Sequence, residues 1–130
     1  MEVTDYTITR SVAMPFEAAV DAVTAALATE GFGVLTTIDV QATLRAKLDV
    51  DVPQYTILGA CNPGLAHAGL EIEPDLGVLL PCNVVVRRSG DRTIVAAMEP
   101  IAAMRLADNP ALEPLAQDAR RRLERVISGL

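Results

Sequence analysis

Apolar and polar residues alternate over residues 3–12, and the apolar positions are Tyr6, Ile8 and Val12. A period of two is typical of a strand with one buried face. The next apolar residues have the spacing of one helical stripe: Phe16, Val20, Val23 and Leu27. Pro15 suits the first turn of such a helix, and Gly31 can end it with a positive φ. The pattern therefore predicts a strand followed by an amphipathic helix.

Two further strands and a short helix are predicted in the middle of the chain. Residues 33–38 and 54–60 form the strands, and the second is apolar on both faces, which is typical of a central position. Asp39 can cap a helix between them, which Pro53 would close. The apolar stripe of this helix consists of Val40, Leu44 and Leu48.

Asparagines and prolines mark the boundaries that follow. Asn62 and Pro63 predict the start of a short helix, because the asparagine side chain can cap it and proline suits its first turn. The apolar run over residues 76–80 predicts a strand, which resumes at residues 84–86. Pro81 interrupts this strand, since proline cannot donate a hydrogen bond to a sheet.

The end of the chain predicts a hairpin and a long helix. Residues 89–91 supply a tight turn, so that residues 93–98 pair back on the preceding strand. Asn109 and Pro110 then mark the start of a helix. Its apolar stripe consists of Leu112, Leu115, Ala119, Leu123, Val126 and Leu130.

These elements follow the order β-α-β-α-β-α-β-β-α, and residues 1–130 contain no stretch that resembles a linker, so we expect a single domain. The fold class is α+β, with a mixed, largely antiparallel sheet, because the hairpin requires antiparallel pairing. The helices are expected mainly on one face of the sheet. The other face would then be open to a ligand or to a second subunit.

Charge and composition narrow the choice of partners. The net charge is −6, and Trp is absent while only two Tyr and two Phe are present, which disfavours a nucleic-acid-binding protein. No apolar run approaches about 18 residues, and the N-terminus lacks a basic segment followed by an apolar one. We therefore expect neither a membrane span nor export, and a cytoplasmic location with reduced thiols.

Candidate chemistry is concentrated in two short motifs, Cys61-Asn62-Pro63 and Pro81-Cys82-Asn83, which hold both cysteines. If Asn62 caps a helix, the Cys61 thiol lies near the positive end of the helix dipole, which stabilises a thiolate. The alternative is that each cysteine is a small buried hydrophobe. His67 is the only histidine, and no ligand spacing typical of a metal site is present, so we expect no metal and no other cofactor.

The order and spacing of several motifs resemble the DUF302 family, a domain of unknown function found in bacteria and archaea. The motifs are Gly31-Phe32-Gly33-Val34, Cys61-Asn62-Pro63, Leu80-Pro81-Cys82-Asn83-Val84 and Pro100. The resemblance runs from Phe16 to the closing helix. It implies a compact fold like that of TATA-binding protein, often seen as a homodimer, and no established activity. Glu99 departs from the aspartate that the family more usually shows before this last proline.

The leading hypothesis is a binding module for a small anionic or sulfur-containing ligand. Its candidate ligand-binding residues are Cys61, Asn62, His67, Pro81, Cys82 and Asn83. One alternative is a thiol-dependent redox carrier or enzyme, with Cys61 as nucleophile and Cys82 as resolving partner. Another is a structural domain that serves dimerisation or other interactions. The sequence does not decide whether a reaction is catalysed.

Overall fold

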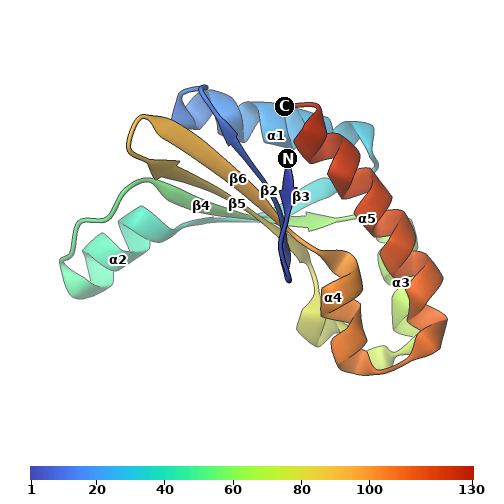
Figure 1. The fold of residues 1–130 in the computed structure, drawn as a ribbon. Coiled ribbons are helices and arrows are strands. Elements are labelled where there is room, and N and C mark those ends of the chain that lie inside the picture. The colour runs from blue at the N-terminus through green and yellow to red at the C-terminus, as the bar shows by residue number, and fades with distance from the viewer.

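The computed structural model describes all residues from 1 to 130. Six strands form one sheet in the order β1-β2-β6-β5-β4-β3 (Figure 1). The strands are β1 (Glu2–Val3), β2 (Thr7–Val12), β3 (Gly33–Asp39), β4 (Tyr55–Cys61), β5 (Cys82–Ser89) and β6 (Arg92–Met98). The α-helices are α1 (Phe16–Thr29), α2 (Val40–Leu48), α3 (Pro63–Ile72), α4 (Pro100–Met104) and α5 (Glu113–Ser128). The 3-10 helices are η1 (Pro74–Leu79), η2 (Arg105–Ala107) and η3 (Pro110–Leu112).

The predicted α+β class is confirmed, and the sheet is more regular than expected. Every pair of neighbouring strands is antiparallel, so the sheet contains no parallel pairing at all. Antiparallel sheets commonly bury one face and leave the other uncovered, and this sheet follows that rule. Figure 1 shows α1 and α5 along one face, whereas α2 and α4 lie towards the other side, beyond opposite ends of the strands.

One hydrophobic core lies between the sheet and helices α1 and α5. The sheet contributes alternate residues to it, which include Ile8, Leu58, Val84 and Val95. The helices contribute residues of the stripes predicted from their spacing: Val23 and Leu27 from α1, and Leu123 and Val126 from α5. Ile127 of α5, which the predicted stripe did not include, is also buried in this core. The core therefore has the aliphatic character expected of a chain so poor in aromatic residues.

Several predicted helix boundaries are confirmed by hydrogen bonds. Asp39 Oδ1 accepts from the Ala42 amide at 2.9 Å and caps α2, and Asn109 Oδ1 accepts from the Ala111 amide at 3.0 Å. Gly31 follows α1 with φ of +81°, which is the left-handed conformation that glycine adopts without steric cost. These caps are local in sequence, and this is why the sequence predicts them well.

Two strand predictions were wrong. Residues 76–80 lie mainly in η1, because Pro74 begins a helical turn and the sheet ladder of β5 starts only after Pro81, which has no N–H to donate. Residues 3–12 do not form one strand either, since the chain turns at residues 4–6 and Tyr6 is 74% exposed.

The predicted order of elements has no helix between the hairpin and the closing helix, but the stretch after Glu99 forms α4. Glu99 caps this helix, since its carboxylate oxygens accept from the amides of Ile101 at 3.3 Å and Ala102 at 2.7 Å. A helix of 5 residues is too short to show a helical period, so only the cap could have signalled it.

Gly31 should be among the residues least tolerant of substitution. A Cβ added there would lie 2.9 Å from Asn62 Nδ2, whereas one added at Gly90, whose φ is +59°, would meet nothing within 4 Å. Gly90→Ala should lower the free energy of unfolding by about 1 kcal/mol through its backbone alone. Gly31→Ala should cost about 2 kcal/mol or more, because Asn62 must also move.

Urea denaturation of both variants measures the difference. If Gly31→Ala and Gly90→Ala lower the free energy of unfolding equally, that result would contradict a tight contact between Gly31 and the Asn62 side chain.

Candidate functional site

The pairing of β4 with β5 decides which parts of the two cysteine motifs lie together. Ala60 pairs with Cys82, and Gly59 pairs with Asn83. Successive side chains of a strand point to opposite faces. Cys82 therefore shares the core face with the buried Ala60 and packs against the hydrophobic core, whereas Asn83 is exposed on the uncovered face. The second motif is thus divided between the two faces of the sheet.

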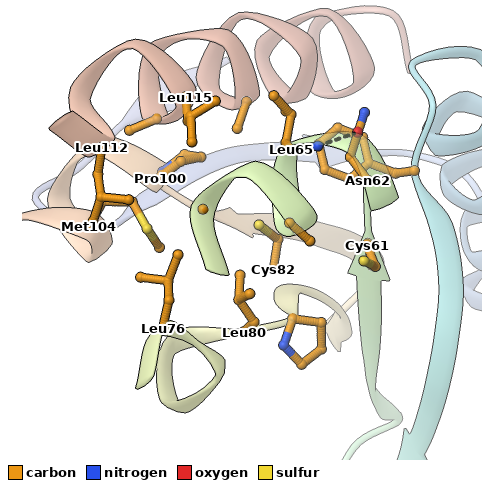
Figure 2. A pocket seen from close by; sticks show the side chains of 17 residues that line it. Cys61, Asn62, Leu65, Leu76, Leu80, Cys82, Pro100, Met104, Leu112 and Leu115 are labelled. Atoms are coloured by element: carbon orange, nitrogen blue, oxygen red, sulfur yellow. Dashed lines mark hydrogen bonds between the residues drawn. The ribbon is translucent and has the colours of Figure 1, made fainter. Parts of the chain in front are cut away.

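A partly enclosed cavity of about 50 Å³ lies where the ends of β4 and β5 meet α3, η1, α4 and α5 (Figure 2). Four of the residues predicted from the sequence line it: Cys61, Asn62, Pro81 and Cys82. Of its 17 lining residues 13 are hydrophobic, so it offers mainly van der Waals contact. The larger apolar residues around it are Phe32, Leu65, Leu76, Leu80, Met104, Leu112 and Leu115.

Asn62 fixes the geometry at one side of the cavity. Its Oδ1 accepts from the Leu65 amide at 3.1 Å and caps α3, as the sequence predicted. Its Nδ2 lies against Gly31, at the turn that joins α1 to β3. Because Gly33 pairs with Cys61, the side chain of Asn62 links three segments beside the first cysteine. In Figure 2 the capping bond appears as a dashed line at the edge of the cavity.

Pro81 positions the second cysteine through close packing on β4. A Cβ added at Gly59 would overlap Thr36 Oγ1 and would lie 2.9 Å from the Pro81 ring. Glycine at this position of the strand therefore lets Pro81 approach the β4 backbone. The Leu80–Pro81 peptide bond is cis, and β5 begins directly after it with Cys82.

The environment of Cys82 keeps its thiol neutral. Burial raises the pKa of Cys82 from its ordinary value of 9.0 to about 11, and the neighbouring Cys61 thiol contributes to the increase. At pH 7 roughly one molecule in ten thousand therefore carries the Cys82 thiolate. Both cysteines are free. Cys82 thus offers the cavity a soft, weakly polar S–H group and very little nucleophile.

Two predicted site residues lie away from the cavity. His67 is on the outer side of α3, where its side chain is 78% exposed and its Nε2 lies 3.1 Å from Glu71 Oε1. Asn83 lines a larger groove on the uncovered face of the sheet. The structure therefore brings together four of the six predicted residues and separates His67 and Asn83 from them.

Glu99 supports the cavity without lining it. Glu99 is 5% exposed, its carboxylate accepts from the first free amides of α4, and Arg120 Nε lies 3.6 Å from its Oε1. The longer glutamate side chain thus still caps a helix at this position. The next residue, Pro100, lines the cavity, so the cap holds that wall in place.

The apolar lining residues were not predicted as part of a site. Leu112 and Leu115 belong to the predicted stripe of the closing helix, and Leu65 to the predicted third helix, yet nothing local indicates that they converge. One signal was present: Leu112 continues the apolar stripe of α5 into η3, beyond the part of the helix that packs on the sheet.

Two comparisons relate the chain to known proteins. The sequence profile described as "Domain of unknown function DUF302" matches residues 8–130. A crystal structure of an uncharacterized conserved protein DUF302 from Bacillus stearothermophilus is 28% identical, with a TM-score of 0.88 over 94% of this chain and 95% of that chain. No protein with a curated description matches. None of the helices has the length and apolar character needed to cross a membrane.

The raised pKa of Cys82 predicts a loss of stability in alkali. The folded protein keeps this thiol protonated up to about pH 11, whereas the unfolded chain ionises it near 9. The protonated thiol therefore makes its full contribution to the free energy of unfolding below pH 9. Roughly 2 kcal/mol of that free energy should be lost as the pH rises from 9 to 11.

Urea unfolding of wild type and Cys82→Ala across this range isolates the effect, because the other titrating groups are shared. Cys61→Ala serves as the control and should keep most of the decline in the free energy of unfolding between pH 9 and 11. An equally steep decline in wild type and Cys82→Ala would contradict the buried, neutral thiol.

Proposed function

This chain belongs to the DUF302 family, and we propose that it binds a small apolar or sulfur-containing molecule in the cavity beside Cys82. The observation that carries this proposal is the partly open, apolar cavity that both free cysteines line. Small apolar cavities with few polar groups stay dry, so a guest need not displace bound water. The energetic gain comes from contacts that an empty cavity lacks.

The size of the cavity limits the guest. An engineered cavity of about 150 Å³ in another protein holds benzene. A cavity of about 50 Å³ therefore has room for roughly two to four non-hydrogen atoms. A thiol or thioether with short alkyl groups fits this limit, and so does the apolar end of a longer molecule whose remainder extends into solvent.

A sulfur-containing guest is chemically compatible with the two cysteines that line the cavity. A protonated Cys82 thiol is polarisable and donates only weak hydrogen bonds, so it favours soft guests over strongly hydrated ones. Met104 adds a thioether to the same lining. These sulfur atoms provide favourable contacts without the desolvation cost of a charged group.

An anionic ligand has less support than the sequence suggested. The amide of Leu65 in the first turn of α3 already donates to Asn62 Oδ1. The cavity also holds no basic side chain among its lining residues. A charged guest would lose its hydration there with little in return.

A thiol-dependent redox carrier is the second candidate, because Cys61 and Cys82 line one cavity. Thiol–disulfide exchange requires a thiolate, and the high pKa of Cys82 opposes its formation at neutral pH. The protonated state of Cys82 therefore supports binding better than redox exchange.

Binding should weaken when a larger side chain fills the cavity. Ala66 lines the cavity and Ala68 on the same helix does not, although both are half-buried, so Ala66→Leu and Ala68→Leu form a matched pair. Dimethyl sulfide and propanethiol should shift the methyl NMR signals of Leu65, Leu112 and Leu115 in wild type and in Ala68→Leu. Ala66→Leu should weaken binding by at least about tenfold, or 1.4 kcal/mol.

Two results would count against this function. The first is a failure of both compounds to shift these methyl signals at millimolar concentration. The second is a shift that Ala66→Leu leaves unchanged. Rapid formation of a Cys61–Cys82 disulfide with a mild oxidant at pH 7, detected by mass spectrometry, would instead favour the redox candidate.

A further inference from the structure

The face of the sheet opposite the core carries a groove of about 710 Å³. Its floor comes from alternate residues of β4, β5 and β6, and residues of α4 and η2 form one wall. Of its 16 lining residues 10 are hydrophobic. Clefts that hold small molecules are commonly about 300 to 1,000 Å³ in volume and are mainly apolar, with a few polar groups that orient the ligand. The groove therefore has the size and the character of a small-molecule site.

Arg87 is the polar group in this groove that lacks a partner. It is half-buried, and its guanidinium forms no ion pair within the chain. The other half-buried arginines each donate a hydrogen bond to an oxygen atom of the chain: Arg10, Arg88, Arg120 and Arg122. A guanidinium that is partly removed from water loses hydration, which a bound acceptor restores. Arg87 is thus the half-buried arginine with no acceptor of its own.

The strand pairing surrounds Arg87 with groups that suit a bound carboxylate. Tyr55 of β4 lies directly opposite Arg87 on one side, and Ile94 of β6 lies opposite on the other. The tyrosine hydroxyl can donate a second hydrogen bond to the same anion. Asn83 lines the groove further along β5 and carries two more donors on its amide. This end of the groove therefore presents donors next to apolar surface.

The charges of the lining residues favour a ligand with a single negative charge. Arg87 is the one basic residue of the lining, whereas Asp5 and Glu99 are acidic. Glu99 already pairs with Arg120, and Asp5 has no cationic partner. One guanidinium can bind one carboxylate through two parallel hydrogen bonds. A dianion would bring a second charge into a groove with uncompensated acid, on a protein whose net charge is −6.

The rest of the groove suits an apolar chain. Val85 and its cross-strand neighbour Ala96 form the middle of the floor, and Leu106 lies at the far wall with a 77% exposed side chain. From Arg87 to Asn83 the strand β5 extends over about 13 Å. A short alkyl or aryl chain placed along this distance would cover apolar surface that the chain itself leaves in water.

We propose that this groove binds a small amphipathic monocarboxylate, with its carboxylate on the Arg87 guanidinium and its apolar body along β5 towards α4. Such a ligand supplies the acceptor that Arg87 lacks and covers the apolar floor in one step. A purely apolar partner surface would cover the floor but leave Arg87 without an acceptor. The site is separate from the cavity beside Cys82, because no residue lines both.

Titration with octanoate, followed by methyl NMR, tests the site. Octanoate should shift the signals of Val85 and Ile94 with a dissociation constant of about 1 mM or less. Butanoate should bind at least about tenfold more weakly, because it has four fewer CH₂ groups to bury. Octanoate that shifts Leu65 and Leu112 but leaves Val85 and Ile94 unchanged would lie in the cavity beside Cys82 and would overturn the proposal.

Arg87→Gln tests the role of the charge. This variant should weaken octanoate binding at least about tenfold, because the charge-assisted hydrogen bonds to the carboxylate are lost. It should leave the weaker binding of 1-octanol unchanged, since the alcohol carries no charge. Arg105→Gln is the matched control, because Arg105 is an exposed arginine of η2 that also lacks an ion pair and does not line the groove. It should bind octanoate as wild type does.

Three further results would overturn the proposal. The first is the absence of any shift at Val85 and Ile94 with millimolar octanoate, whether water or another protein surface occupies the groove. The second is an equal loss of octanoate and 1-octanol binding in Arg87→Gln, which would mean that Arg87 only shapes the groove. The third is tighter binding of octyl phosphate than of octanoate at pH 8, where the phosphate is a dianion.

Discussion

The antiparallel register of β4 and β5 is the constraint on which the candidate site depends. It sets Cys82 opposite Ala60 on the core face and sends Asn83 to the uncovered face. A shift by one residue would exchange these faces, and Cys82 would lose its place in the cavity. Gly59 secures the register, because only a residue without a side chain leaves room there for Thr36 and Pro81. The chemistry of the cysteines thus follows from strand pairing.

The second requirement is a set of side-chain caps at the edge of the core. The Asn62 side chain caps α3 and packs against Gly31. The Glu99 side chain caps α4 and forms an ion pair with Arg120. These caps satisfy helix amides that would otherwise face apolar surroundings. Helices α3 and α4 can therefore pack beside the cavity without exposing unsatisfied backbone amides to it. The same arrangement explains why the space beside Cys82 remains apolar although the Asn62 side chain lines it.

Features that depend on neighbouring residues could be predicted from the sequence, and features that depend on tertiary contacts could not. The caps at Asp39 and Asn62 and the stripes of α1 and α5 were predicted because a few adjacent residues determine them. The strand period already implied that Cys82 and Asn83 point to opposite faces. Convergence of Leu65, Leu76 and Leu112 around the thiols was not predictable, since it depends on how three segments pack. The helical turn of η1 was missed because its apolar residues carry no distinct period.

The central claim is that the space beside Cys82 is a dry, apolar site rather than a gap that water fills. Xenon enters apolar cavities of this kind, so a crystal structure of the protein under xenon pressure tests the claim most directly. The account predicts a xenon atom in contact with Cys82 and Leu112, and its loss in the Ala66→Leu variant. Ordered water molecules in this space, with no xenon bound there, would contradict it.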